Sequence, residues 1–180
     1  VCYLGNLSPL YSFTTIVEAA KMASKNKLKI KFILCGKGSK LNKLKKISED
    51  INNLISPGYI YKNQIKTILD LSHLGLVPYK NLYSFLNTIS NKSAEYLSAS
   101  LPIALSINNG LLYEKLKAHK AGFSYSENPE KLINNILQIK DNPEILSSFQ
   151  ANAYKYYKSE LDGEKVYNDF ANYLEDLSNK

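Results

Sequence analysis

The sequence contains no arginine and no tryptophan, so lysine alone carries its strong basic charge. Its 23 lysines against 16 acidic residues give a net charge of +7, which is a feature of many nucleic-acid-binding proteins. Arginine is the usual residue for bidentate recognition of bases and phosphates, and the lysines are spread out except in residues 37–46. The composition therefore argues against a nucleic-acid partner. Diffuse positive charge fits peripheral contact with an acidic membrane surface better.

Cysteine, histidine and long apolar runs are also scarce. Cys2 and Cys35 lack the CxxC spacing of zinc sites, which favours buried free thiols in a reducing compartment. His73 is expected to pack before a strand and His119 to lie on an exposed helix end, and neither has the neighbours of a metal site. No run approaches the roughly 20 apolar residues that span a bilayer, and no signal peptide is recognisable. We expect a cytoplasmic protein, peripheral at most to the inner face of the membrane.

Short apolar segments alternate with segments of helical spacing along all 180 residues. The expected strands are 1–5, 28–35, 54–61, 74–78, 103–106 and 122–125, the third being shortened or interrupted by its Pro-Gly pair. The expected helices are 14–24, 40–50, 63–71, one after 91, then 111–120, 129–140, 143–157 and 166–177. Alternation of this kind predicts an α/β fold with a Rossmann-like, doubly wound parallel sheet, helices on both faces and extra C-terminal helices.

Glycine-containing turns follow the first three expected strands. Ligands of doubly wound sheets bind beyond the carboxyl ends of the strands, so these turns and the end of the fourth strand are candidate binding segments. Each is also compatible with an ordinary turn, and 36–39 matches neither a Walker A motif nor a GxGxxG fingerprint. Ser8 is a candidate cap for the helix that contains Ala19 and Ala20. The candidate binding residues here are Gly5, Asn6, Gly36, Lys37, Gly58, Tyr59, Ile60 and Tyr79.

The most informative stretch is 91–97, followed by the proline-started strand after Leu101. It predicts a polar turn and an amphipathic helix whose free N–H groups suit a diphosphate. Glu95, about one turn inside the helix, is placed to accept hydrogen bonds from sugar hydroxyls. The candidate binding residues of this helix are Asn91, Lys92, Ser93 and Glu95.

Taken in order, segments 3–7, 18–20, 32–38, 58–60, 76–79, 91–97 and 101–103 resemble the C-terminal, donor-binding domain of group 1 glycosyltransferases. The resemblance implies one half of a GT-B fold and retaining transfer from a nucleotide-diphosphate sugar, with no bound metal or other cofactor. It implies that Glu95 holds the ribose, that backbone near Lys92 and Ser93 meets the diphosphate, and that 58–60 contacts the base. It assigns no catalytic residue.

The sequence departs from the family pattern in three ways. Asn87 stands where the family often has a first carboxylate, seven residues before the second. Asn6 and Tyr11 stand approximately where an arginine and a lysine often neutralise the diphosphate, and Ser100 replaces a common glycine. Either Lys37 or Lys92 compensates, or the chain belongs to a divergent branch that uses fewer cations.

The resemblance also predicts how the chain is organised. Residues 1–180 are expected to form one nucleotide-sugar-binding domain, with 158–180 a helix that docks on an N-terminal domain outside this chain. The chain starts as if within a strand, so we expect an inactive fragment of a hexosyltransferase. Its acceptor would be a glycan or lipid-linked molecule in bacterial surface-polysaccharide or lipopolysaccharide biosynthesis. The alternatives are half of a nucleotide-sugar epimerase and a non-catalytic nucleotide-binding module, which the departures at Asn6 and Asn87 favour.

Overall fold

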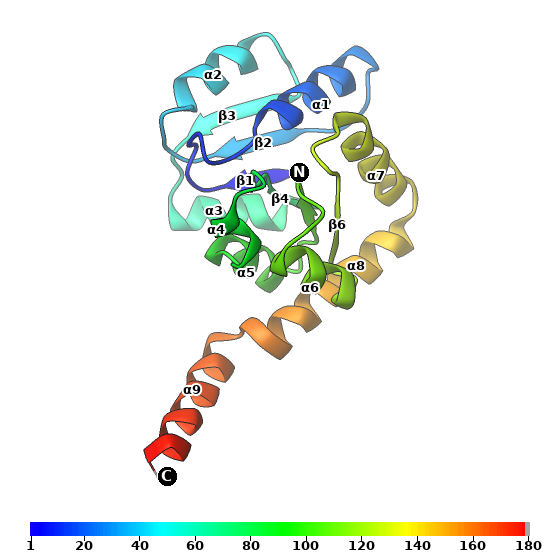
Figure 1. The fold of residues 1–180 in the computed structure, drawn as a ribbon. Helices are drawn as coiled ribbons and strands as arrows, with labels where there is room; N and C mark the ends of the chain where they lie inside the picture. Colours follow the sequence, from blue (N-terminus) through cyan, green and yellow to red (C-terminus); the bar gives the residue numbers. More distant parts are fainter. Residues whose placement is uncertain (179–180) are drawn as a thin grey trace.

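The computed structural model describes residues 1–178, in which six strands form one parallel sheet (Figure 1). The strands are β1 (Cys2–Leu4), β2 (Phe32–Cys35), β3 (Leu54–Gly58), β4 (Gly75–Val77), β5 (Ile103–Leu105) and β6 (Gly122–Ser124). They lie in the order β3-β2-β1-β4-β5-β6, so the direction of winding reverses between β1 and β4. The predicted doubly wound sheet is confirmed, and its switch point is the place where such sheets bind ligands.

Helices cover both faces of the sheet (Figure 1). One face carries α1 (Thr14–Lys25), α2 (Leu41–Glu49) and α7 (Pro129–Asp141), and the other carries α3 (Lys62–Asp70), α5 (Asn91–Ser98) and α6 (Leu111–His119). Successive strand residues point to opposite faces, so Tyr3 joins the first core while Cys2 and Leu4 join the second.

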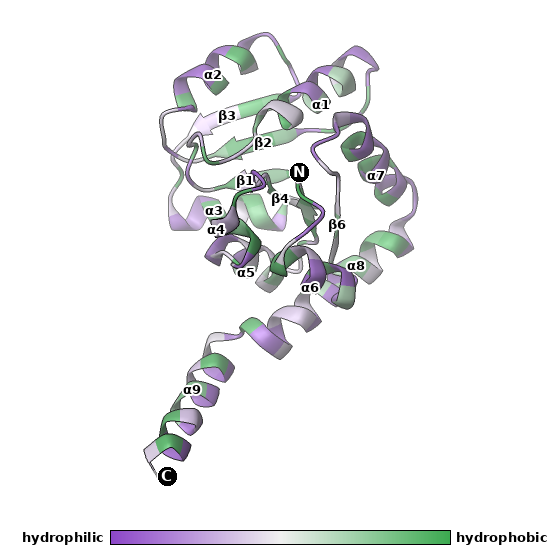
Figure 2. Cartoon of the chain, viewed as in Figure 1, coloured by the Kyte–Doolittle hydropathy of each residue, from purple (hydrophilic) through white to green (hydrophobic). Residues whose placement is uncertain are grey.

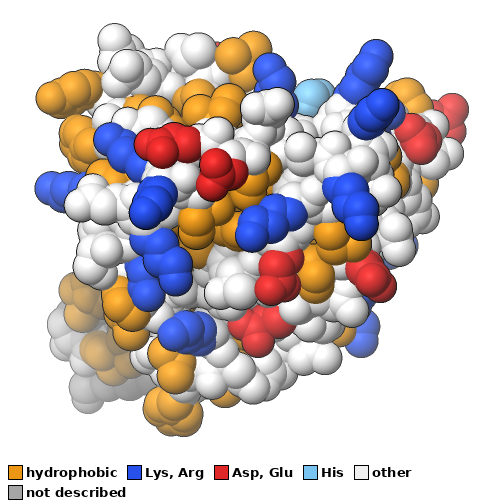
Figure 3. Space-filling view, turned by 90° about the horizontal axis from the view of Figure 1, so that it is seen from above, with side chains coloured by type: hydrophobic (Ala, Val, Ile, Leu, Met, Phe, Trp, Pro, Cys, Tyr) orange, Lys and Arg blue, Asp and Glu red, His pale blue; other side chains and the backbone are white. Residues whose placement is uncertain are grey.

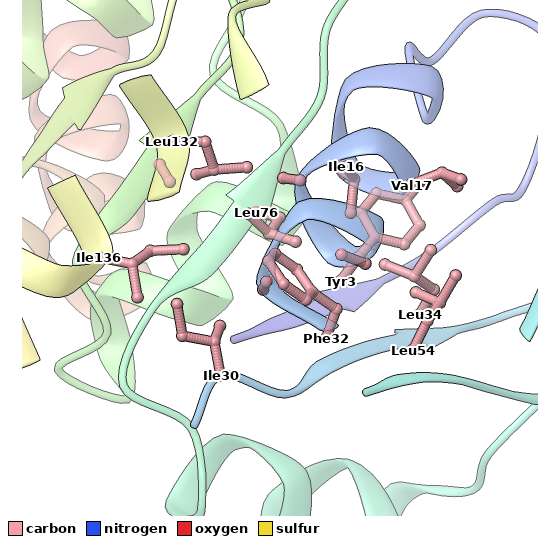
Figure 4. Close-up of a cluster of buried hydrophobic side chains, with 14 of the residues drawn as sticks. Tyr3, Ile16, Val17, Ile30, Phe32, Leu34, Leu54, Leu76, Leu132 and Ile136 are labelled. Atoms are coloured by element: carbon pink, nitrogen blue, oxygen red, sulfur yellow. The ribbon is translucent and has the colours of Figure 1, made fainter. Parts of the chain in front are cut away.

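The first core is the larger hydrophobic cluster (Figure 4). Phe32 and Leu76 meet Ile16 of α1 and Ile136 of α7 there, across the middle of the sheet. Each fully buried side chain of this size stabilises the fold by about 1.5–3 kcal/mol. The helical spacing predicted for α1 is confirmed, since its apolar residues are buried together.

Several predicted boundaries were wrong for local reasons. The second strand begins at Phe32, because residues 28–31 follow Lys27 at a positive φ of 53° and stay outside the sheet ladder. The third strand is shortened, as predicted, and ends at Gly58; it runs through Pro57 because β3 is an edge strand, with a shift in its register against β2. Ser8 does not cap α1: that helix begins at Thr14 after Phe13, with no side-chain cap. The short helix α4 (Tyr83–Leu86) was not predicted, because four residues show no periodicity.

The chain leaves the sheet through α8 (Pro143–Tyr156), a π-helical turn η1 (Tyr157–Leu161) and α9 (Gly163–Ser178). The α8 helix ends against the second core, where Ala153 and Tyr156 are buried. The α9 helix projects away from the domain (Figure 1), and polar and apolar residues interleave along it (Figure 2). Its exposed apolar residues are Val166, Tyr167, Phe170, Tyr173, Leu174 and Leu177.

The segment predicted as the helix 158–180 is therefore divided. Residues 157–161 form the π-helical turn, the helix begins at Gly163, and 179–180 lie outside the described residues. Asp162 separates the two, its carboxylate accepting a hydrogen bond from the Glu164 N–H over 3.1 Å. Docking of this helix on another domain stays a prediction. No helix within residues 1–178 is long and apolar enough to cross a membrane.

Ending the chain after Asp162 is expected to leave the free energy of unfolding within about 0.5 kcal/mol of the full chain. The reason is that no residue of α9 within the described range is buried. Urea unfolding of both chains measures the difference. A loss of more than about 2 kcal/mol would show that α9 packs on the domain.

Candidate functional site

A cavity of about 680 Å³ lies at the carboxyl ends of β1, β2 and β3. Its volume falls within the range of about 300–1,000 Å³ that is typical of small-molecule sites. Its lining is Leu4, Gly5, Asn6, Cys35, Gly36, Lys37, Gly38, Tyr59, Ile60, Ile65, Lys92 and Glu95. The predicted binding residues among them are Gly5, Asn6, Gly36, Lys37, Tyr59, Ile60, Lys92 and Glu95, so segments far apart in the sequence are brought together. Their contact with a ligand stays a prediction.

Backbone hydrogen bonds join the three predicted turns. The Gly5 N–H donates to the Cys35 carbonyl over 3.0 Å, and the Gly36 N–H donates to the Gly58 carbonyl over 2.8 Å. These bonds continue the sheet ladder beyond the strands, so the turns after β1, β2 and β3 lie edge to edge. These three turns therefore form a backbone surface on one side of the cavity, and hydrogen bonds between neighbouring turns hold it in place.

Helix α5 is fastened beside this backbone surface at two points. At its start, the Ser93 N–H donates to the side chain and carbonyl of Ser90, at 3.3 and 2.9 Å. In its middle, the Leu4 N–H donates to the Tyr96 hydroxyl over 2.7 Å. Gly75 makes room for that ring, since a Cβ there would lie 2.3 Å from it. Tyr96 is thus locked to β1, which places the adjacent Glu95 at the cavity.

Glu95 is the carboxylate of the cavity. Partial burial raises its pKa above the ordinary value for a glutamate. Within residues 1–178 its carboxylate takes part in no salt bridge or hydrogen bond. Both oxygens are therefore available to accept hydrogen bonds from the hydroxyls of a ligand.

Lys92 and Lys37 supply the positive charge of the lining. The Lys92 Nζ is buried and lies 4.2 Å from the ring centroids of both Tyr3 and Tyr11. The Lys37 Nζ lies 5.5 Å from the ring centroid of Tyr59, whose side chain is exposed at the rim. An exposed aromatic face beside an ammonium group is suited to a planar, electron-rich ring such as a nucleobase.

Four predicted residues do not line the cavity. Gly58 ends β3 just before Tyr59 and serves by accepting the Gly36 hydrogen bond. Asn91 is the exposed first residue of α5, whereas Ser93 is buried with its hydroxyl 3.0 Å from that of Ser90. The Ser93 N–H is thus already bonded within the protein and is not free for a diphosphate.

Tyr79 follows the carboxyl end of β4, as predicted, but it does not line the cavity. It is fully buried and stacks on Phe85 with ring centroids 4.3 Å apart. Its backbone is held by an isolated bridge to Tyr11, and its carbonyl accepts a hydrogen bond from Ser106. The residue therefore packs the loop after β4 against the second core.

Four lining residues were missed as binding residues: Leu4, Cys35, Gly38 and Ile65. Gly38 carried a usable signal, the second glycine of a G-x-G turn. A Cβ on it would lie 2.5 Å from the Leu7 carbonyl oxygen. Cys35 was predicted only as a buried free thiol, which is confirmed along with Cys2, and burial raises its pKa to about 11. Ile65 lies on α3, whose sequence gives no sign of a cavity.

The remaining polar candidates lie apart from the cavity lining. Asn87 is exposed and its amide donates to the Tyr83 carbonyl over 3.3 Å. His119 ends α6, as expected, but it is only partly exposed, because it stacks on Tyr156 and lies 2.7 Å from the Glu160 carboxylate. His73 precedes β4 but is exposed. Within the described residues, no three His, Cys, Asp or Glu side chains gather as a metal site.

The family model described as glycosyl transferases group 1 matches residues 1–156. Comparison with curated proteins found no significant match. Among solved structures, Anabaena HepE in complex with UDP has a TM-score of 0.80 at 14% identity, over 97% of this chain and 48% of that one. The C-terminal domain of the group 1 glycosyl transferase LpcC from Francisella tularensis has a TM-score of 0.70 at 11% identity, over 88% and 84%.

The catalytic domain of the Helicobacter pylori cholesterol-α-glucosyltransferase has a TM-score of 0.69 at 17% identity, over 87% of this chain and 95% of that one. At sequence identities this low, the similarity to these solved structures shows the fold alone. The chain spans about half the length of HepE and 34% of S. aureus TarM.

Proposed function

Because the chain belongs to the group 1 glycosyl transferases, we propose that it is the donor-binding half of an enzyme that transfers a sugar from a nucleotide-diphosphate sugar to an acceptor. The observation that carries this proposal is the convergence of the turns after β1, β2 and β3 with helix α5 on one cavity. The cavity has the size for a nucleotide and combines a free carboxylate, two lysines and an exposed aromatic ring.

Each part of a nucleotide sugar has a chemical match in the lining. Glu95 accepts hydrogen bonds from the ribose hydroxyls, and the turn at Tyr59 and Ile60 contacts the base. The start of α5, which enters the lining at Lys92, receives the diphosphate. Negative charge develops on that diphosphate as it departs, so positive groups fixed beside it lower the barrier to transfer. No metal or other cofactor is needed for this contribution.

The finer identity of donor and acceptor rests on the neighbours. HepE was crystallised with UDP-glucose, TarM with UDP and α-GlcNAc-glycerol, and WaaG is described as involved in lipopolysaccharide biosynthesis. We therefore propose a hexosyl donor on a nucleoside diphosphate. The proposed acceptor is a glycan or lipid-linked molecule in bacterial surface-polysaccharide or lipopolysaccharide biosynthesis.

We propose a cytoplasmic enzyme that touches the inner membrane face through diffuse charge, without a fixed lipid site. On the side carrying α1 and α2, lysines are scattered with acidic side chains between them (Figure 3). Such a surface is attracted diffusely to acidic lipid and offers no single basic patch to a nucleic acid.

The acceptor site is proposed to lie on a second domain. The chain spans only about half of HepE, and α9 carries an exposed apolar face suited to such a domain. Without that partner, this chain is expected to bind donor but not to transfer sugar. Steady turnover by the isolated chain would contradict this division of labour.

A thermal-shift panel tests donor binding. The panel contains UDP, GDP and ADP, each with and without an attached sugar. We expect the compounds of one of these three bases to raise the melting temperature of the chain. Glu95→Gln removes the charge that accepts the ribose hydroxyls, so the shift should largely disappear, corresponding to a loss of about 1.5–3 kcal/mol of binding. Glu49→Gln, which changes an exposed glutamate on α2, is the matched control and should retain the shift.

The outcome that overturns the proposal is a chain that no nucleotide stabilises. A shift that is equal in the Glu95→Gln and Glu49→Gln variants would instead place the nucleotide elsewhere on the domain.

A further inference from the structure

Lys92 occupies an unusual position for a charged side chain. Its Nζ is buried 4.2 Å from each of two ring centroids, Tyr3 from β1 and Tyr11 from the following loop. Within residues 1–178 the Nζ forms no hydrogen bond and no salt bridge. Faces of this kind attract a cation by about 0.5–2 kcal/mol each, which is less than burial without a counter-ion costs. The two rings therefore hold the amine in place, but they do not supply the counter-charge that a buried ammonium ion needs.

The Lys92 amine lies beside the Gly5 turn of the cavity. A Cβ on Gly5 would lie 2.9 Å from the Lys92 Cε and 3.4 Å from its Nζ. Gly5, Lys92 and Glu95 all contribute to the lining, so an anion lying on the Gly5 turn meets both the amine and the start of α5. A doubly charged diphosphate supplies the counter-charge that Lys92 does not find within the protein.

We propose that Lys92, held between Tyr3 and Tyr11, is the cation that neutralises the donor diphosphate, and that it takes up a proton when the donor binds. The inference rests on the proposed donor-binding function. It identifies Lys92 as the residue that takes the role of the arginine which the chain lacks. Before binding, burial lowers the pKa of Lys92 to about 7. On binding, the neutral amine gains one proton from the buffer and becomes the ammonium ion that pairs with the diphosphate.

Other titratable groups also face this site. Some of them have pKa values that burial moves away from neutral pH, and the others can be replaced in control variants. Burial raises the pKa of Tyr3 from β1, of Tyr11 from the loop and of Cys35 from β2, away from neutrality. Glu95 on α5 is a carboxyl whose pKa is raised from an acidic starting value. The remaining groups are Lys37 across the cavity and Tyr79 behind Tyr11.

Calorimetric titration with UDP-glucose tests the proposal, with ADP-glucose and GDP-mannose as the other bases. These diphosphate diesters keep a constant charge between about pH 6 and about pH 8.5, so any proton uptake belongs to the protein. Titrations in phosphate and Tris, which differ in ionisation enthalpy, measure that uptake directly. Uptake should approach one proton near pH 8, and affinity should fall by up to about tenfold per pH unit above pH 7.

Three variants assign the proton. Lys92→Met keeps the apolar stem, and it should weaken binding about 10- to 100-fold at pH 6 and abolish both the uptake and the pH dependence. Lys37→Met should retain the uptake whatever its effect on affinity. Lys25→Met, at the exposed end of α1, should bind as the unmodified chain does.

The possible failures are separable. Binding that is independent of pH, or Lys92→Met binding equal to that of the unmodified chain, overturns the role of Lys92 while donor binding stands. Binding of none of the three nucleotide sugars even at pH 6 overturns the donor-binding function and this inference with it.

Discussion

Gly36→Ala is expected to destabilise the domain by more than about 4 kcal/mol, which is a large share of the stability of a domain this size. Gly36 has a φ of +146°, which side-chain-bearing residues rarely adopt, and its Cβ would lie 1.7 Å from the Gly5 carbonyl oxygen. The obstacle is backbone, so no side chain can rotate to relieve it. Chemical denaturation followed by circular dichroism measures the loss.

Gly163→Ala is the matched control for this prediction. A Cβ at Gly163 has nothing within 4 Å, and alanine is the better residue at the start of a helix such as α9. The control should therefore be neutral or slightly stabilising. If Gly36→Ala unfolded at the same denaturant concentration as the control, the close approach of the two cavity turns would be wrong.

Lys92→Met is expected to stabilise the folded chain at low pH, by an amount that shrinks as pH rises. In the unfolded chain Lys92 has the ordinary lysine pKa and stays charged, whereas burial lowers its pKa to about 7 in the folded chain. Below about pH 7 the amine is charged in both states, so the full cost of burying it is present. Above that, the unfolded chain binds more protons, and stability rises by up to about 1.4 kcal/mol per pH unit relative to the variant.

Urea unfolding of both proteins between about pH 6 and about pH 9 measures this difference. The two free energies should converge as pH rises, whereas Lys25→Met should follow the unmodified chain throughout. Parallel curves for Lys92→Met and the unmodified chain would mean that Lys92 keeps its ordinary pKa in the folded protein.

The sheet and its helices were largely predictable, because they depend on the spacing of apolar residues and on the turn residues between segments. Alternating apolar segments led to six strands, and the helix expected over 129–140 forms as α7, where the Asn128 side chain accepts from the Lys131 N–H over 2.8 Å. The errors came from tertiary context. Whether Pro57 breaks a strand depends on its place at the sheet edge, which no local pattern reveals.

The cavity was predictable to the extent that topology alone brings its parts together. Carboxyl ends of parallel strands meet at one edge, so the turns at Gly5 and Gly36 lie side by side because β1 pairs with β2. Side-chain direction was not predictable, since it follows from packing. Tyr79 turned inward onto Phe85, and Lys92 turned onto two tyrosines that the sequence separates from it by more than 80 residues.

The most direct test of donor binding at this cavity is an amide chemical-shift titration of the chain with UDP, repeated with GDP and ADP. Glycine amides resolve well and sample the whole molecule, so they report position. The predicted result is that one nucleotide shifts the amides of Gly5, Gly36, Gly38 and Glu95 while Gly122 and Gly163 stay unchanged. Shifts that gather away from these turns, or no shifts with any of the three nucleotides, would contradict a donor site at the ends of β1, β2 and β3.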